Sequence, residues 1–153
     1  MLIIIDGPDG SGKTTLAKRL ADITGYEYFH FSYPTSPAEK RCMVQKYRDF
    51  IKNHPNAILD RSWYSEMVYG PIVRGVSHVS RKDMQDLEIL LCKHGGLIIY
   101  CTDKPEVLWQ RATKRGEDYI TKYETFEAIC ELFDDILGVQ HLIPVVKYDY
   151  KDL

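Results

Sequence analysis

The sequence has no run of about 18 apolar residues, which argues against a segment that crosses a membrane. The apolar opening MLIIID is too short for the core of a signal peptide, and it has neither a basic flank nor a small-residue cleavage site. This opening therefore predicts a buried strand. We expect a cytoplasmic protein with no membrane partner.

Closely spaced metal ligands are also missing. The four cysteines form no CxxC pair, and the five histidines show no HxxxH or HExxH spacing. These absences argue against a zinc site and against a dithiol redox motif. We expect reduced thiols in the core at all four positions, which are Cys42, Cys92, Cys101 and Cys130.

The chain has little net charge and no long linker. A formal charge of -2 gives no electrostatic reason to expect a nucleic-acid partner, although a small basic patch within a balanced total would still allow one. No repeat, low-complexity tract or Gly/Ser-rich linker divides the 153 residues. We therefore expect a single domain over residues 1–153.

Short apolar segments alternate with longer amphipathic ones, which is typical of βαβ units on a parallel sheet. The segments are rich in β-branched and aromatic residues, as in strands that are covered on both faces. The pattern predicts a three-layer α/β fold in which helices flank five parallel strands, at residues 2–6, 27–31, 57–60, 97–101 and 142–146.

Helix starts are indicated by a Ser or Thr with an acidic residue three positions later, the capping-box pattern. It occurs at residues 36–39, 80–83 and 121–124. Apolar residues at helical spacing then predict the buried faces of two helices. These residues are Leu16, Ala17, Leu20 and Ile23 in the first helix, and Tyr123, Phe126, Ile129, Cys130, Phe133, Ile136 and Leu137 in the last.

The segment GPDGSGKT, residues 7–14, matches the phosphate-binding pattern GxxxxGK(S/T), with a predicted strand before it and a predicted helix after it. Glycines let successive backbone N–H groups turn toward a polyphosphate, and the helix start adds its positive dipole end. We expect ATP and Mg²⁺ as cofactors, with Lys13 on the β- and γ-phosphates and the Thr14 hydroxyl on the metal. The predicted nucleotide-binding residues are Gly7, Asp9, Gly10, Ser11, Gly12, Lys13, Thr14 and Thr15.

The loop alone does not distinguish a kinase from a GTPase or a motor. The chain lacks the NKxD motif of guanine-specific GTPases, and its length excludes helicases and large motors. A small kinase remains.

The predicted strand AILD is followed directly by a charged pair, Asp60 and Arg61. Ligands bind at the carboxyl ends of parallel strands, so this pair should lie beside the phosphate loop. An arginine there can hold an acceptor phosphate, and an aspartate can hold Mg²⁺ through water or accept a proton. A local ion pair with Ser62 as a helix cap is the structural alternative, and it is compatible with a functional role.

Three segments resemble the thymidylate kinase family. DGPDGSGKTT is similar to its acidic phosphate loop, LDRSWYSEMVYGPIVRG to its DR(Y/F/S)xxSxxAYQxxxRG segment, and KPEVLWQRATKRGEDYI to its PEVxxxRxxxRGxxD segment. The resemblance implies a P-loop NTPase fold and transfer of the γ-phosphoryl group of ATP to dTMP, which gives dTDP. It also implies that Asp9 contacts the acceptor's sugar, that Arg61 contacts its phosphate, and that Tyr69 and Arg74 line its pocket. Members are commonly dimers, so a homodimer is an expected assembly.

The chain departs from that family in several places. Gly70 stands where members usually have Gln, and the early acceptor segment is represented only by HFSYPTSP, where Phe31, Tyr33 and Pro34 offer either an aromatic wall or core packing. DRSWYSEMVY also resembles the ERSxxSxxxF segment of deoxynucleoside kinases, which would make Asp60 the general base on a sugar hydroxyl. A kinase of a hydroxyl on a modified DNA base and an ATP-binding module without catalysis are further alternatives.

The segment at about residues 111–122 is expected to form a lid over ATP. Arg111, Lys114 and Arg115 share one helical face, and Gly116 then breaks the helix. A solvated basic face is the alternative. We expect Arg111 or Arg115 to act on the transferring phosphoryl group, beside Lys13, Asp60 and Arg61 as the other catalytic candidates.

Overall fold

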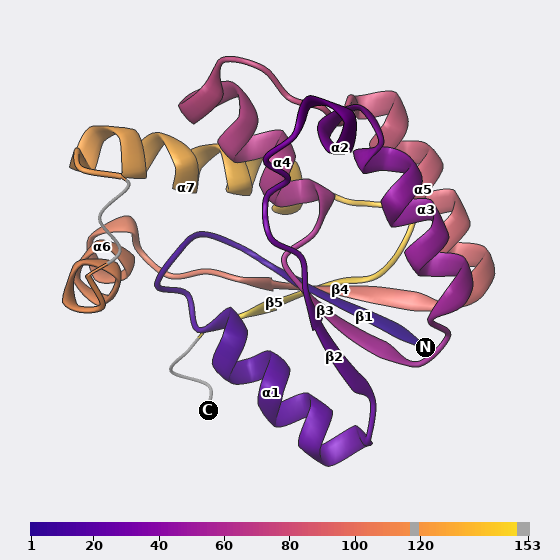
Figure 1. Ribbon diagram of the computed structural model, residues 1–153. Helices are drawn as coiled ribbons and strands as arrows, with labels where there is room; N and C mark the ends of the chain where they lie inside the picture. Colours follow the sequence, from indigo (N-terminus) through magenta and orange to yellow (C-terminus); the bar gives the residue numbers. More distant parts are fainter. Residues whose placement is uncertain (117–119, 150–153) are drawn as a thin grey trace.

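A computed structural model describes residues 1–116 and 120–149, shown in Figure 1. The strands are β1 Leu2–Asp6, β2 Glu27–His30, β3 Ala57–Asp60, β4 Gly96–Cys101 and β5 Val145–Tyr148. The helices are α1 Lys13–Thr24, α2 Pro37–Arg41, α3 Met43–Asn53, α4 Trp63–Tyr69, α5 Arg81–His94, α6 Pro105–Lys114 and α7 Tyr123–Leu137, and a π-helical turn, η1, covers Gly70–Arg74.

The five strands form one parallel sheet in the order β2-β3-β1-β4-β5. Strand β1 is central, and all five of its residues are buried, since it has a strand on each side and helices on both faces. The predicted parallel α/β architecture is confirmed. Its order brings the ends of β1 and β3 together, which places residues 6–14 next to residues 60–62.

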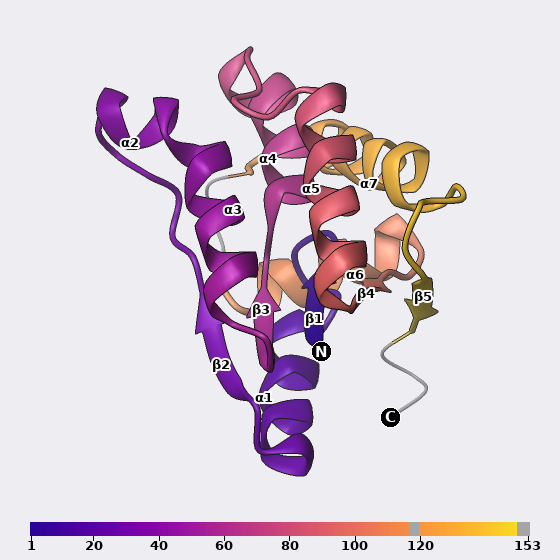
Figure 2. The same ribbon diagram turned by 90° about the vertical axis from the view of Figure 1, so that its right-hand side faces the viewer.

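The sheet is the middle of three layers (Figures 1 and 2). Among the described helices, α1 covers one face, where Leu16 and Ala17 pack against Ile3, Ile5 and Ile58. The other face carries α3, α4, α5 and α7 and the larger core cluster. The amphipathic stripe predicted for α7 is buried as expected, apart from Tyr123, which is partly exposed.

The last strand begins three residues later and ends two residues later than the sequence pattern predicts. Instead of residues 142–146, β5 covers Val145–Tyr148, and its register with β4 begins at the pair Ile98 and Val145. Pro144 has no N–H to donate and only accepts, from the Ile98 N–H at 2.9 Å. In the loop before β5, Ile143 is buried in the core, whereas Leu142 is 62% exposed. The apolar residues at 142–146 therefore belong partly to this loop and partly to the strand.

Three other predictions from the pattern are wrong. Ile23 lies in the last turn of α1 and is 75% exposed, because that turn extends past the sheet face that Leu16 and Ala17 cover. Thr121 does not cap α7, since the N-cap residue is Lys122 and no side chain caps it. Cys42 and Cys92 are exposed, and only Cys101 and Cys130 are buried thiols.

The other two predicted helix caps are present, and one of them is a complete capping box. Ser80 and Asp83 form a reciprocal capping box at the start of α5, and the Ser36 hydroxyl accepts from the N–H of Glu39 at the start of α2.

Within residues 1–116 and 120–149, no helix combines the length and apolar character needed to cross a membrane.

A buried ion pair ties the α7–β5 connection to α5. His141 Nδ1 lies 2.9 Å from Glu88 Oε1, and its Nε2 lies 2.5 Å from the carbonyl oxygen of Ile136 in α7. Both ring nitrogens face acceptors, so the doubly protonated imidazolium fits the site best. The hydrogen bond to Glu88 raises the pKa of His141, against the opposing effect of burial.

We predict that His141→Gln lowers the free energy of unfolding by about 3 kcal/mol near pH 6, because Glu88 would then be a buried charge without a cationic partner. The pKa of His141 is raised above its unfolded value of 6.5, so this stabilisation is complete below that value and is lost as the pH rises through the folded-state pKa. Urea titrations between about pH 6 and pH 9 should show the two proteins converging. His94→Gln, at the exposed end of α5, is the matched control, and a gap independent of pH would contradict the charged pair.

Candidate functional site

The loop between β1 and α1 has a backbone that requires glycine. Gly7, Gly10 and Gly12 have φ values of 151°, 79° and 83°. A Cβ at Gly7 would overlap the carbonyl oxygen of Cys101, and one at Gly10 would lie 2.5 Å from the carbonyl oxygen of Leu108 in α6. The loop is therefore packed closely between β4 and α6, and α1 begins at Lys13 as the sequence predicts.

Lys13 reaches back across this loop. Its side chain is buried, and Nζ donates to the carbonyl oxygen of Pro8 at 2.7 Å. Burial lowers the pKa of Lys13 and the nearby Arg61 lowers it further, whereas Asp9, Asp6 and Asp60 raise it. The ammonium group lies inside the turn of the loop, where the sequence places the β- and γ-phosphates. Of the other predicted nucleotide-binding residues, Ser11 is buried, whereas Thr14 and Thr15 are exposed on the first turn of α1.

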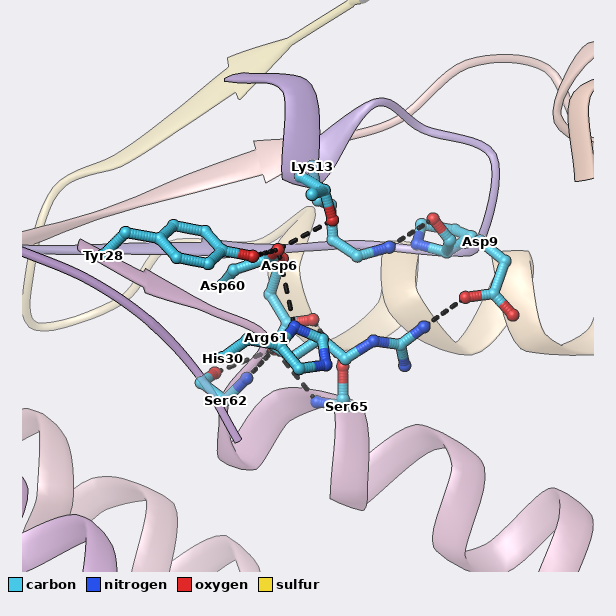
Figure 3. A network of polar contacts seen from close by, with 11 residues as sticks. Asp6, Asp9, Lys13, Tyr28, His30, Asp60, Arg61, Ser62 and Ser65 are labelled. Carbon is cyan, nitrogen blue, oxygen red and sulfur yellow. Dashed lines mark hydrogen bonds and ion pairs between the residues drawn. The ribbon is translucent and has the colours of Figure 1, made fainter. Parts of the chain in front are cut away.

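Asp60, at the end of β3, links helix α1 to the sheet. Its Oδ2 accepts from the Thr14 hydroxyl and from the Tyr28 hydroxyl, each at 2.7 Å, and His30 Nδ1 lies 3.5 Å from the same oxygen (Figure 3). Burial and the hydrogen bond to Asp60 raise the pKa of Tyr28 to about 12, so its hydroxyl stays a donor at neutral pH.

The Thr14 and Asp60 pair fits the chemistry of Mg²⁺. Asp60 Oδ1 is buried and has no hydrogen-bond partner among the described residues, and a buried oxygen of this kind suits a cation or its bound water. The described residues contain no group of three or more His, Cys, Asp or Glu side chains that could hold a metal. Mg²⁺ commonly takes one or two carboxylates together with water and substrate phosphates.

Asp6 is a buried acid that the sequence analysis did not single out. Its two oxygens accept from the backbone N–H groups of Gly7, Ser62 and Ser65 and from both serine hydroxyls, at 2.5 to 3.1 Å (Figure 3). Burial raises the pKa of Asp6, while the hydrogen bonds from Ser65 and Ser62 and the charge of Lys13 oppose that rise. The carboxylate therefore fixes the start of α4 against the start of the loop. Ser62 caps α4 as predicted.

Arg61 points from the end of β3 toward the loop. It forms an ion pair with Asp9 (Figure 3). Its guanidinium lies 5.4 Å from the centre of the Tyr69 ring. Its φ of 70° is left-handed, a conformation that costs a non-glycine residue about 1 kcal/mol. Its N–H donates to the carbonyl oxygen of Ile5 at 2.9 Å, which anchors this backbone to the central strand.

A cavity of about 690 Å³ opens beside Arg61, between the β2–α3 segment and α4 with η1. Phe31, Tyr33, Tyr47 and Tyr69 give it aromatic walls, and Pro34 also lines it. The structure thus places Tyr33, Arg61, Tyr69 and Arg74, all predicted for the acceptor, around one cavity.

Glu66 is a second acid missing from the sequence candidates. It is buried in the cavity wall on α4, where it pairs with Arg74 and accepts from the N–H of His78 at 3.0 Å. The Arg74 guanidinium in turn lies 3.8 Å from the centre of the Tyr33 ring. A Cβ at Gly70 would lie 2.9 Å from Glu66 Oε1 and 2.6 Å from the carbonyl oxygen of Val76, so the glycine makes room for this pair.

Of the proposed lid residues, Arg111 belongs to α6, the helix that packs against the loop at Gly10. Arg111 pairs with Asp103 at 3.2 Å, near the start of α6. Lys114 and Arg115 are exposed at the end of that helix. Residues 117–119 of the predicted lid lie outside the described residues.

Known proteins were compared with the chain by sequence and by structure. No protein-family model matches it. A deoxyguanosine kinase from Dictyostelium discoideum is 27% identical over 107 residues, and the match covers 56% of this chain. The chain spans only 38% of the length of that curated relative.

Solved structures, kinases among them, share the fold. YorR from Bacillus subtilis, in complex with phosphorylated GDP, has a TM-score of 0.81 and 24% identity over 97% of this chain and 85% of YorR. A deoxyadenosine kinase from M. mycoides, with dCMP and dCDP bound, has a TM-score of 0.63 and 20% identity over 99% and 90% of the two chains. A gluconokinase from Sinorhizobium meliloti reaches 0.61 at 15% identity over 96% and 81%. The predicted three-layer P-loop fold is confirmed, and at these identities the likeness establishes the fold alone.

We predict that Asp6→Asn destabilises the protein by roughly 3 kcal/mol, because both Asp6 oxygens face backbone N–H groups and an amide nitrogen would meet at least one of them. Asp22→Asn, on the exposed side of α1, is the matched control. The measurement is the denaturant midpoint at constant slope. An unchanged midpoint for Asp6→Asn would show that the buried site does not require a carboxylate.

Proposed function

We propose that this chain is an ATP-dependent nucleotide kinase that transfers the γ-phosphoryl group to a deoxynucleoside monophosphate, with dTMP as the leading acceptor and dTDP as its product. One observation carries the proposal. The phosphate loop with Lys13, the Thr14–Asp60 pair and Arg61 meet at one edge of the sheet, and Arg61 borders an aromatic cavity large enough for a nucleotide.

On the donor side, the loop N–H groups and Lys13 would bind the polyphosphate. Thr14 and Asp60 would hold Mg²⁺, which neutralises charge on the phosphoryl oxygens when it is bound. Lys13 Nζ would exchange the carbonyl oxygen of Pro8 for charged phosphate oxygens, which are stronger acceptors. The transition state of phosphoryl transfer is loose, so the residues act mainly by alignment and charge stabilisation.

On the acceptor side, a monophosphate suits the cavity better than a nucleoside. A nucleoside needs a base near its hydroxyl, whereas a monophosphate brings an oxygen that is already ionised. Asp60 is not among the residues that line the cavity, its side chain is 1% exposed, and its Oδ2 is taken up by two hydroxyl donors. Arg61 borders the cavity and supplies the cation that an acceptor phosphate would need.

The base would contact the Glu66–Arg74 pair. A carboxylate accepts from ring N–H groups and a guanidinium donates to carbonyl oxygens, and thymine and guanine both offer the two kinds of partner. The likeness to thymidylate kinase segments favours thymine. The deoxyguanosine kinase relative and the GDP derivative bound to YorR make guanine the second base to test.

Other functions remain as alternatives with separate outcomes. A deoxynucleoside kinase would phosphorylate thymidine or deoxyguanosine, and a kinase of modified DNA would act on a hydroxyl carried by a base. A non-catalytic module would bind ATP without turnover. The direct test incubates Mg²⁺-ATP with each dNMP, with nucleosides and with hydroxymethylated duplex DNA, and separates the products by chromatography. A diphosphate product supports the proposal, and a product only from nucleosides or DNA contradicts it.

We predict that Lys13→Ala lowers kcat/KM by roughly 10² to 10³, as when one preorganised donor to the reacting group is removed. Arg19→Ala on the exposed side of the same helix is the control and should retain wild-type turnover. Steady-state kinetics with the best acceptor provide the measurement. Wild-type turnover in Lys13→Ala would refute the role of the loop.

We predict that Glu66→Gln raises KM for the acceptor by about tenfold or more and changes the order of preference among bases, because a charged hydrogen-bond acceptor is lost from the cavity wall. Glu39→Gln is the matched control, since Glu39 also lines the cavity but lies on the short helix α2. If both variants keep the wild-type order of bases, Glu66 does not contact the base.

A further inference from the structure

The two oxygens of Asp60 have different surroundings. Oδ2 accepts two hydroxyl hydrogen bonds of 2.7 Å, one from Thr14 on α1 and one from Tyr28 on β2. Oδ1 is buried and has no partner within the described part of the chain. The two donors thus share one carboxylate oxygen. A buried oxygen without a hydrogen-bond partner lowers the stability of the protein unless a ligand binds to it.

Tyr28 reaches Asp60 from a fixed position. Strands β2 and β3 are paired so that Tyr28 lies opposite Ile58 and His30 opposite Asp60. Side chains two residues apart share a sheet face, so Tyr28 and Asp60 both point toward the face that α1 covers. The Tyr28 ring packs against the small core cluster on that face, and its hydroxyl ends at the carboxylate.

Thr14 and Tyr28 would have different roles when a cation is bound. A threonine hydroxyl can give an oxygen lone pair to Mg²⁺ and still donate its proton to Asp60. Tyr28 reaches the same carboxylate oxygen from β2. The χ2 torsion of an aspartate is soft, so one donor alone holds it weakly. A second donor on the same oxygen fixes the carboxylate and keeps Oδ1 available.

We propose that Tyr28 is a positioning residue for the metal site: it holds Asp60 by Oδ2, so that Oδ1 is the oxygen that accepts Mg²⁺ or a metal-bound water. The inference rests on the proposed function for the presence of Mg²⁺-nucleotide. It assigns a role to a β2 residue outside the phosphate loop and outside the Asp60–Arg61 segment. His30 Nδ1 also approaches Oδ2, but at 3.5 Å it is too far for a strong hydrogen bond and cannot replace the tyrosine hydroxyl.

The test measures metal binding directly. Mn²⁺ binding to the ADP-saturated protein is followed by electron paramagnetic resonance, with Tyr28→Phe compared with the wild type. We expect the Mn²⁺ Kd to rise by about tenfold, as is typical when an outer partner of a metal site is removed. ADP affinity without metal should stay within about twofold, because the hydroxyl of Tyr28 donates to Asp60 and no hydrogen bond joins it to Lys13 among the described contacts.

Tyr26→Phe is the matched control. Tyr26 precedes the same strand and packs against the same small cluster, so this variant removes the same atom without touching Asp60. An unchanged Mn²⁺ Kd in Tyr28→Phe overturns the proposal, and so does an equal loss in Tyr26→Phe, which would indicate general loosening of that face.

A double-mutant cycle separates positioning from structural support. If Tyr28 acts through Asp60, then Asp60→Asn and the double variant with Tyr28→Phe should bind Mn²⁺ with similar Kd values. Additive losses would overturn the proposal. Because Mn²⁺ and ADP binding need no acceptor, failure to find any phosphoryl acceptor would count against the kinase and would be distinct from failure of this inference.

Discussion

The hydrogen bonds of Asp6 are the constraint on which the site depends. A carboxylate at the end of the central strand is buried, and it is stable there because five donors from the loop and from α4 surround it. Each donor belongs to a segment that carries functional candidates, since Gly7 opens the phosphate loop and Ser62 follows Arg61. One side chain thus sets the separation between the loop and the start of α4.

The cations of the site each lie beside an acceptor of the protein. Lys13 donates to a loop carbonyl, Arg61 pairs with Asp9, Arg74 pairs with Glu66 and Arg111 pairs with Asp103. These partners keep the positive charges from repelling one another and hold their side chains in place. A phosphate that bound to these cations would exchange one partner for another, so its net binding free energy would be smaller than that of a new ion pair.

Much of the fold was predictable because it depends on short-range patterns. Buried parallel strands give apolar segments, and the phosphate loop joins a strand to a helix, so β1, α1 and the Asp60–Arg61 pair were found from the sequence. Predictions failed where tertiary packing overrode the pattern, as at Pro144, where an apolar loop precedes the strand, and at Ile23, where a helix extends past the sheet. Asp6 and Glu66 were missed because a buried acid is recognised by its partners, which are distant in sequence. A charged residue ending LIIID was the available signal for Asp6.

The absence of a side chain at position 70 has a consequence for how the acceptor pocket can change. Any Cβ there would press on the Glu66 carboxylate and on the Val76 carbonyl, so a larger residue would require a different acid position and a different path for η1. Positions 66 and 70 are therefore coupled, because a side chain at position 70 would require the Glu66 carboxylate to withdraw as well as the Val76 carbonyl to move. A library designed to give the pocket a new base preference should vary the two positions together, with the 74–76 turn left free to adjust.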